Sequence, residues 1–327
     1  MGILSSIKPH VVSRDLRGYS VLFYGTPKSG KTTIASHFPG AVVFAFEKGY
    51  SAIPGIMATP VNSWGEFRKL LIELKDEETK QQFQTVVIDT ADIAYDYCEQ
   101  YICNDNDVDT IGDIPYGKGY LLVQDEFDTC IRKIIQLGYG LVLISHSTDR
   151  VEKDEQGNEY TRMEPTLDKR GRLICERTCD IIGLSRPFKT EDGTIETRLY
   201  LRETPRYVAG SRFKYMPDYI VFTYENLVKA IGDAIDKEAA EHDGKLVTDE
   251  RQNNYIEKQL NIPPLADMKK EAENLFGTLM EADAANRSKI SKIIAEYLGQ
   301  GKTFKDTTEK DAEKVWLIIQ ELRTLVK

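Results

Sequence analysis

The stretch Gly25-Thr26-Pro27-Lys28-Ser29-Gly30-Lys31-Thr32 fits the phosphate-loop pattern G-x-x-x-x-G-K-[ST] at every required position. An apolar run from residue 19 to residue 24 predicts a buried strand before it, and residues 32–38 predict a short helix after it. Glycines let the backbone N–H groups of such a loop approach phosphate oxygens closely. We therefore expect the loop, together with Thr33, to bind a nucleotide, with Lys31 at the β- and γ-phosphates and Thr32 on Mg²⁺.

The segments that follow this loop alternate between predicted strands and predicted helices. Continuous apolar runs at 41–46 and 141–144 are typical of strands covered on both faces, and residues 84–88 predict a further strand. Helices are expected at 63–75, 91–103, 117–137 and 168–179, and antiparallel hairpins at 147–167 and 180–202. This alternation predicts an α/β core with a mostly parallel sheet, helices on both faces and an antiparallel extension.

Changes of composition along the chain suggest four parts. We expect an irregular lead-in at 1–18, a nucleotide-binding core at 19–240, a polar linker at 241–254 and a small helical domain at 255–327. The last part carries only helical patterning, at 268–280, 284–298 and 309–325.

Overall composition excludes several classes of protein. The formal net charge of −9 over 327 residues argues against a protein that coats duplex DNA by bulk electrostatics. The five cysteines form no C-x-x-C pair and lack a histidine at zinc-ligand spacing, so we expect reduced thiols in a cytoplasmic protein and no zinc site. No apolar run reaches 18 residues, so we expect no membrane span and no membrane partner.

Polar residues end three of the predicted strands. Asp89 follows the run at 84–88 and is expected to hold Mg²⁺ with Thr32, although an aspartate there could simply cap the next helix. Glu47 follows the run at 41–46 and is the candidate base for activating water; the alternative is an exposed strand-end glutamate. His146 could contact the γ-phosphate or be satisfied beside the sheet. The carboxyl ends of parallel strands share one edge, so we expect these residues to lie close together.

Together these features resemble the RecA superfamily, and within it the phage Sak-type single-strand annealing ATPases, also called phage nucleotide-binding proteins. Thr90, rather than a second acid, follows Asp89, which disfavours most AAA-type motors. The resemblance covers residues 19–222 and is carried by residues 25–33, Phe46-Glu47-Lys48-Gly49, Val87-Ile88-Asp89-Thr90, Tyr116-Gly117-Lys118-Gly119-Tyr120 and Ile144-Ser145-His146.

The resemblance implies specific roles for several residues. Glu47 would activate water, and His146 stands where RecA-like proteins commonly carry a glutamine that couples the γ-phosphate to DNA-binding loops. It also implies a homo-oligomer, filament or ring, in which a neighbouring subunit supplies a basic finger. The candidates for that finger are Arg206, Arg212 and Lys214.

Nucleic-acid contacts are also implied by the resemblance, on the loops after Asp89 and His146. Residues 185–214 hold seven basic and four acidic side chains, a better local surplus than the loop after His146. Aromatic side chains that could stack on bases are Tyr116, Tyr120 and Tyr160, although a tyrosine in such a position is more often a packing residue. The basic candidates are Lys169, Arg170 and Arg172, with Arg150 and Lys118 added.

The phosphate loop and its surroundings predict a Mg²⁺-dependent ATPase. The resemblance further implies a protein of phage recombination that binds single-stranded DNA and promotes annealing or strand pairing in the bacterial host cytoplasm. Its helical domain could bind a single-strand-binding protein or a nuclease. One alternative is a nucleotide-gated adaptor that binds ATP, hydrolyses it negligibly and recruits partners through the helical domain. Another is a small-molecule P-loop kinase, which would need a second basic substrate pocket and a lid.

Overall fold

A computed structural model describes residues 9–242, 244, 246–251 and 262–326. The chain divides into two compact units, Met1–Glu257 and Lys258–Lys327, which are treated separately below. Residues 1–8 of the expected lead-in, residues 243, 245 and 252–254 of the expected linker, and residues 255–261 and 327 of the expected helical domain lie outside the described residues.

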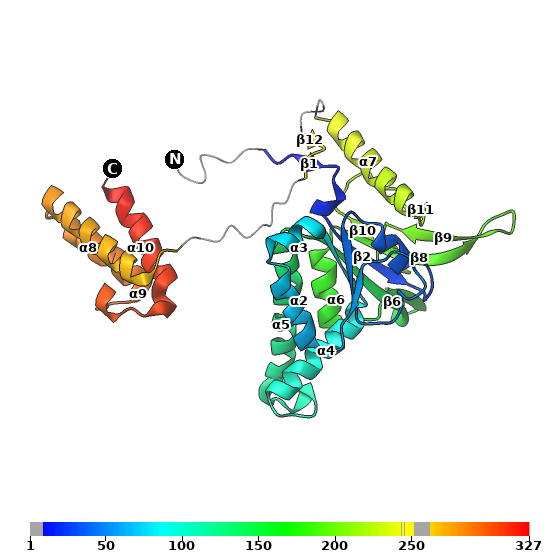
Figure 1. Cartoon of the computed structure of the whole chain (residues 1–327), viewed down its shortest axis with the longest axis horizontal. Helices are drawn as coiled ribbons and strands as arrows, with labels where there is room; N and C mark the ends of the chain where they lie inside the picture. Colours follow the sequence, from blue (N-terminus) through cyan, green and yellow to red (C-terminus); the bar gives the residue numbers. More distant parts are fainter. Residues whose placement is uncertain (1–8, 243, 245, 252–261, 327) are drawn as a thin grey trace. The chain divides into compact units, whose positions relative to one another are not determined.

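The phosphate-loop strand β2 (Ser20–Gly25) lies inside a sheet that has ten strands among the described residues (Figure 1). Its parallel neighbours are β6 (Gly140–Lys153) on one side and β8 (Ile181–Lys189) on the other. Beyond β6 the order continues, still parallel, through β5 (Thr85–Asp89), β3 (Ala41–Ala45) and β4 (Ala58–Pro60). The strand β6 therefore separates the strand that precedes the phosphate loop from the strand that ends in Asp89.

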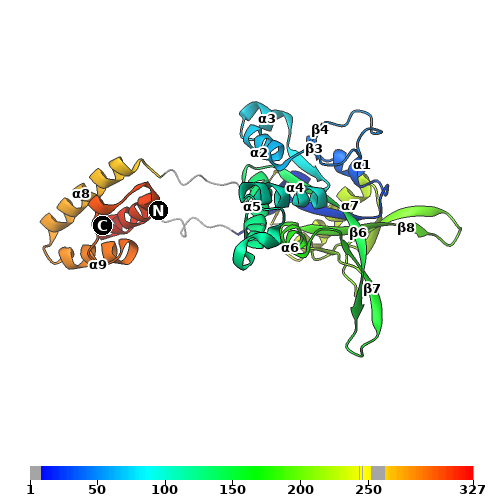
Figure 2. The same ribbon diagram turned by 90° about the horizontal axis from the view of Figure 1, so that it is seen from below.

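Antiparallel strands extend this sheet, as the sequence predicted. β8 turns into β9 (Ile195–Tyr200), which pairs with β11 (Tyr219–Val221), while β10 (Gly210–Ser211) pairs with the start of β8. β6 runs on beyond the sheet and pairs with β7 (Glu159–Pro165). Figure 2 shows the β6–β7 and β8–β9 hairpins projecting from the body in different directions.

Two apolar cores lie on opposite faces of the sheet, which explains the continuous apolar runs. Leu22 packs with α2 (Trp64–Glu73), α4 (Ala91–Asp105), α5 (Lys118–Gln136) and α6 (Lys169–Thr178). Its neighbours Val21 and Phe23 pack with α1 (Lys31–Ser36) and α7 (Tyr224–Ala240). Successive strand residues point to opposite faces, so a strand covered on both sides must be apolar at nearly every position. The expected α/β class is confirmed.

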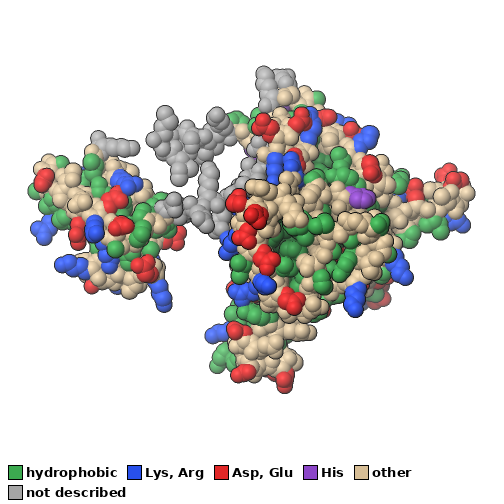
Figure 3. Space-filling view, in the orientation of Figure 1, with side chains coloured by type: hydrophobic (Ala, Val, Ile, Leu, Met, Phe, Trp, Pro, Cys, Tyr) green, Lys and Arg blue, Asp and Glu red, His purple; other side chains and the backbone are tan. Residues whose placement is uncertain are grey.

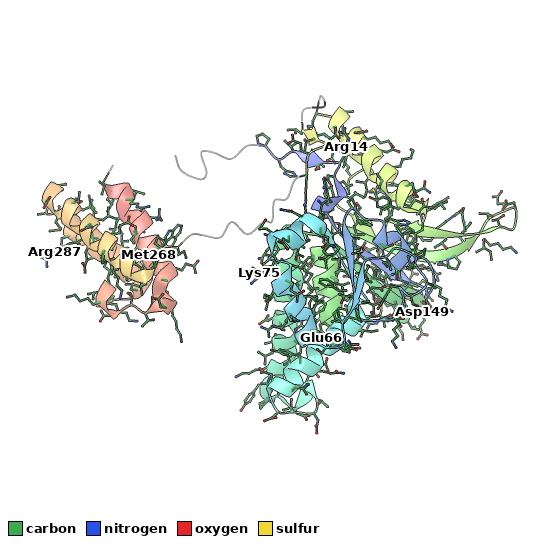
Figure 4. The ribbon with its side chains drawn as sticks, in the orientation of Figure 1. Arg14, Glu66, Lys75, Asp149, Met268 and Arg287 are labelled. Atoms are coloured by element: carbon green, nitrogen blue, oxygen red, sulfur yellow. The ribbon has the colours of Figure 1, made fainter. Side chains whose placement is uncertain are left out.

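A short strand in the expected lead-in pairs with one in the expected linker, so the lead-in is not irregular throughout. β1 (Val12–Ser13) lies parallel to β12 (Val247–Thr248). Arg14, labelled in Figure 4, donates from Nε to Asp236 on α7 at 2.9 Å and from Nη1 to Asp249 at 2.8 Å. Residue 14 thus joins both segments to α7. These two strands are far apart in the sequence and only two residues long each, so neither leaves a recognisable pattern in the local sequence.

The segment between α4 and α5 contains two short 3₁₀ helices, Ile111–Asp113 and Pro115–Gly117, at the tip of this helix pair. The short helix α3 (Glu77–Gln82) also had no separate sequence prediction, and its side chains are not buried.

The second unit is helical over its described part, residues 262–326. It contains α8 (Leu265–Ala282), α9 (Asn286–Leu298) and α10 (Ala312–Leu325), preceded by the 3₁₀ turns Phe304–Asp306 and Glu309–Asp311. Buried residues from all three helices, such as Leu279, Ile290 and Ile318, form its core. Among the residues described in either unit, no helix is both long and apolar enough to cross a bilayer.

Candidate nucleotide-binding and hydrolysis site

The phosphate loop packs directly against β8, and this contact requires glycine at its first position. Gly25 has a φ of +146°, and a Cβ there would lie 2.0 Å from the carbonyl oxygen of Ser185. Ser29 Oγ and Ser185 Oγ lie 2.7 Å apart and share a hydrogen bond within the interior. Gly30, with a φ of +87°, then caps the start of α1. The loop is therefore held from β8 on one side and from α1 on the other.

The Lys31 ammonium group lies over this loop and is almost fully buried. Its Nζ donates to the carbonyl oxygens of Gly25 at 3.0 Å and Thr26 at 2.8 Å. Burial lowers the pKa of Lys31, while the carboxylates of Asp89, Asp92 and Glu47 act in the opposite direction. A buried ammonium ion beside carbonyl groups can bind phosphate oxygens strongly, because little water competes for it.

Thr32 and Asp89 meet as the sequence predicted for a magnesium site. Thr32 Oγ1 donates to Asp89 Oδ2 at 2.7 Å. Burial raises the pKa of Asp89, and the hydrogen bond from Thr32 lowers it. A Cβ on Gly49 would lie 3.7 Å from each of these two oxygens, so this side of the pair is bordered by a residue without a side chain. A hydroxyl and a carboxylate oxygen are ligands that suit Mg²⁺, and these residues fit that ion.

Glu47 is brought to the same edge by its backbone. The N–H groups of Phe46 and Glu47 donate to the carbonyl oxygen of Asp89 at 2.7 and 3.1 Å. The Glu47 side chain reaches His146, with 3.0 Å between Oε2 and Nε2, and both side chains remain partly exposed. A half-exposed carboxylate beside the phosphate loop can contact water, which a general base requires.

His146 lies beside the phosphate loop because its strand, β6, adjoins β2. In the register of the two strands His146 is opposite Gly25. Its backbone N–H donates to Asp92 Oδ2 at 3.4 Å. Within the described residues, His146 Nδ1 and Thr90 Oγ1 are buried without a hydrogen-bond partner. Such atoms normally bind water or a ligand, which fits a nucleotide with its hydration at this edge.

Sequence reasoning missed two residues of this site. Asp92 was not singled out, although an acid in the first turn of the helix after Asp89 was visible in the sequence. Ser185 gave no local signal, because its role depends on the register between β8 and β2.

Within the described residues, none of the three finger candidates has a side-chain hydrogen bond or ion pair to the phosphate loop of its own chain. Arg212 pairs with Asp180, 3.1 Å away, beside the amino end of β8, whereas the phosphate loop follows the carboxyl end of β2. Lys214 pairs with Glu241 at 2.7 Å. Arg206 is exposed in the turn before β10. A contact from any of them to a neighbouring subunit stays a prediction.

Two of the basic nucleic-acid candidates are engaged by a buried carboxylate. Glu164, 4% exposed, is hydrogen-bonded to Arg172 and lies 3.5 Å from Arg150 Nε. Arg162 also lies 3.7 Å from it. This cluster joins the base of the β6–β7 hairpin to α6, so Arg150 and Arg172 have a structural role independent of any DNA.

The side chains of the remaining basic candidates are exposed to solvent. Lys169 and Arg170 begin α6 and Lys118 begins α5, and all three are exposed. The Arg170 guanidinium lies 4.5 Å from the centre of the Tyr120 ring. Figure 3 shows basic and acidic side chains interspersed on the face in view, rather than one basic surface. Any nucleic-acid site on that face must therefore be local.

Comparison with known proteins identifies the first unit more closely. Residues 17–213, more than half of the chain, match the AAA domain family. A Bacillus subtilis (strain 168) protein described as SPbeta prophage-derived uncharacterized protein YorG is 29% identical over 326 residues, covering 97% of this chain and 96% of that protein. The flagellar accessory protein FlaH from Methanocaldococcus jannaschii aligns with a TM-score of 0.34 and 10% identity over 63% of this chain and 85% of that chain. The sequence analysis took Thr90, in place of a second acid after Asp89, as evidence against AAA-type motors. The family match does not support that inference, which rested on a single position.

Proposed function

The chain belongs to the AAA domain family, and from that premise we propose that it binds and hydrolyses ATP with Mg²⁺ at the site around Lys31 and Asp89. The loop amides and Lys31 hold the phosphates, and Thr32 and Asp89 hold the metal. Bound Mg²⁺ would supply charge neutralisation between the β- and γ-phosphates. Nucleotide binding is what the family and the loop support most directly.

Hydrolysis would depend on Glu47, which has the position and exposure of a general base. Glu47 accepts the proton of the attacking water, and His146 orients the carboxylate through the contact at 3.0 Å. The positive charge of Lys31 stabilises the negative charge that develops on the transferred phosphoryl group.

We further propose that the protein is RecA-like, of the phage Sak type, and uses its ATP-bound state to engage single-stranded DNA for annealing or strand pairing. One observation carries this proposal. His146 contacts the candidate base, and the next residue, Ser147, begins the pairing of the β6–β7 hairpin that projects from the body (Figure 2). A change at the γ-phosphate can therefore reach the β6–β7 hairpin through a single residue. The β8–β9 hairpin has its own contact with the phosphate loop, because Ser185 of β8 shares a hydrogen bond with Ser29. The prophage-derived relative supports a phage origin, and hence action in the host cytoplasm.

Assembly belongs to the same proposal. ATP would lie between subunits, with Arg206, Arg212 or Lys214 of a neighbour completing the site. The helical second unit would recruit a single-strand-binding protein or a nuclease.

The test is ATP hydrolysis by the full chain, with and without an oligothymidine, across a range of salt concentrations. We expect stimulation by the single strand that weakens steeply with salt, and little stimulation by a blunt duplex. If DNA leaves the rate of ATP hydrolysis unchanged at every salt concentration, the proposed recombination function is contradicted, but the proposed ATPase activity is not.

A nucleotide-gated adaptor is the second candidate, favoured by the separate core of the helical unit. It predicts ATP binding with negligible turnover under all of these conditions, so the same experiment separates the two functions.

A further inference from the structure

The β8–β9–β11 extension has one face buried and one face open. Leu199 and Ile220 pack into the core that α7 covers. Because side chains alternate along a strand, the residues between them point to the other face. Strand register places Tyr219 opposite Tyr200 and Phe188 opposite Glu196 there. The aromatic residues associated with this open face, here called the aromatic strip, are Phe188, Tyr200, Tyr207 and Tyr219.

The rings of the aromatic strip and the Arg198 guanidinium form a continuous row. The Arg198 guanidinium lies 3.4 Å from the centre of the Phe188 ring and 4.3 Å from that of Tyr219. Tyr219 is 5.9 Å from Tyr200, and Tyr200 is 5.3 Å from Tyr207, measured between ring centres. Arg198 thus holds two rings in place by cation–π contacts. Phe188 is nevertheless 37% exposed and Tyr219 44% exposed, so ring surface remains accessible.

Uncompensated positive charge accompanies these rings. Arg186, Lys189 and Arg206 are exposed and have no ion-pair partner in the part of the chain that the structure describes. Strand register places Arg186 opposite Arg198, on the same face of the sheet as Phe188.

The other projecting hairpin has the opposite character. Residues 147–165 on β6–β7 hold three basic and six acidic residues, and each of those three basic residues is paired with a nearby glutamate. Residues 185–214, which include β8 and β9, hold seven basic and four acidic residues. Of the two hairpins, the β8–β9 side is therefore the better match for a polyanion.

We propose that the aromatic strip, flanked by Arg186, Lys189 and Arg206, is the surface on which this protein binds single-stranded nucleic acid. Unpaired bases stack on the exposed rings, and the phosphates lie beside the basic side chains. A duplex cannot bind in this way, because its bases are already stacked on one another. The assignment rests on the proposed function, since it names the site for the DNA that function requires.

The strand β8 connects this surface to the nucleotide site. Ser185 contacts Ser29 of the phosphate loop and packs against Gly25, and Phe188 follows three residues later on the same strand. The aromatic strip therefore responds to the position of the phosphate loop without any intervening flexible segment. Binding of a single strand is expected to be tighter when the loop is occupied.

The experiment measures binding of a fluorescent oligothymidine by anisotropy, with the full chain and a non-hydrolysable ATP analogue. A Phe188→Ala/Tyr219→Ala variant should bind at least about 30-fold more weakly, because each lost stacking contact costs about tenfold in affinity. Its ATP hydrolysis without DNA should be unchanged, since neither ring contacts the phosphate loop. A Phe188→Trp/Tyr219→Trp variant, which keeps ring surface, should bind within about threefold of the wild type.

Two further variants test where the single strand binds and whether the flanking arginines contact its phosphates. Val151→Ala/Tyr160→Ala removes side chains from the β6–β7 hairpin and should leave binding within about twofold. Arg186→Gln/Arg206→Gln should lower the slope of log affinity against log salt by about 1.4, as expected for two phosphate contacts on a single strand.

The possible outcomes separate a failure of the proposed binding surface from a failure of the proposed function. If the wild type binds the oligothymidine and the alanine variant binds it equally well, the aromatic strip is the wrong site while the proposed function stands. If the Val151→Ala/Tyr160→Ala variant alone loses binding, the β6–β7 hairpin is the DNA surface. If the wild type binds no single strand, the DNA part of the proposed function fails as well. If the alanine variant changes only the sedimenting mass, the strip is an interface between copies of the chain.

Discussion

Glu47 Oε2 lies 3.0 Å from His146 Nε2, although their strands are not neighbours in the sheet. β5 lies between β3 and β6, so the Glu47 side chain reaches across the strand end that carries Asp89. The candidate base Glu47, the candidate metal ligand Asp89 and His146, which directly precedes the β6–β7 hairpin, therefore lie together at one edge of the sheet.

Glu47→Gln should lower the turnover of ATP by about 10² to 10³, because a general base contributes on that scale. Affinity for ATP should change by less than about threefold, since the amide keeps the size of the side chain and can still contact His146. Steady-state hydrolysis and equilibrium nucleotide binding measure the two effects. Glu73→Gln, on the exposed face of α2, is the control. Equal turnover by wild type and Glu47→Gln would show that Glu47 is not the base.

Lys31→Ala should weaken ATP binding about 30-fold, in line with the loss of a charge-assisted hydrogen bond to phosphate. Calorimetric titration of the nucleotide measures this. Lys28→Asn is the matched control in the same loop, because Lys28 is exposed and its φ of +62° suits asparagine. If both variants lost affinity equally, Lys31 would have no special contact with the nucleotide.

Asp89→Asn should raise the thermal stability of the ligand-free protein but reduce the further stabilisation that Mg²⁺ and ATP provide. Burial raises the folded-state pKa of Asp89 above its unfolded value, so the ionised carboxylate destabilises the ligand-free protein at neutral pH. The variant should therefore unfold at a higher temperature at pH 7. That advantage should shrink as the pH falls through the raised pKa, and vanish where both states are protonated.

Stabilisation by Mg²⁺ and ATP should be smaller in Asp89→Asn than in the wild type, because an amide is a weaker ligand for Mg²⁺. Thermal unfolding at several pH values, with and without Mg²⁺ and ATP, measures both changes in the unfolding temperature. A ligand-free variant that is less stable at pH 7 would contradict the assigned cost of burying this charge.

Ser185→Ala should lower the free energy of unfolding by about 1 kcal/mol, the usual net value of a hydrogen bond, because Ser29 loses its buried partner. It should also weaken ATP binding, since the loop is then held less firmly against β8. Urea unfolding and nucleotide titration measure these effects. Lower stability with unaltered ATP affinity would mean that the contact does not position the loop.

Arg172→Gln should lower the free energy of unfolding by about 2 kcal/mol, because it removes one of the cations around the buried Glu164 carboxylate. Affinity for single-stranded DNA should not change. Arg170→Gln, two residues earlier and exposed, is the matched control and should change stability by less than about 1 kcal/mol. A variant Arg172→Gln of normal stability and weaker DNA binding would restore Arg172 as a DNA contact.

Local signals in the sequence were sufficient for much of the site. The phosphate loop is one contiguous stretch, and Asp89, Glu47 and His146 each end an apolar run that reads as a buried strand. The carboxyl ends of parallel strands meet at one edge, so recognising the strands was enough to predict that these side chains converge. The sequence could not sort the basic residues in this way, because a guanidinium that faces solvent and one that neutralises a buried carboxylate look the same in a sequence.

The chain order of strands and helices, and hence the α/β class, followed from apolar periodicity alone, because that periodicity is set by which faces a segment must bury. Tertiary structure decided the pairing of Ser29 with Ser185, the carboxylate of Glu164 among three arginines, and the row of rings across β8, β9 and β11. These contacts depend on strand register and on residues far apart in the chain. A shift of one residue in register would turn the side chains on β8, β9 and β11 to the opposite face, and nothing in the local sequence records which register the folded chain selects.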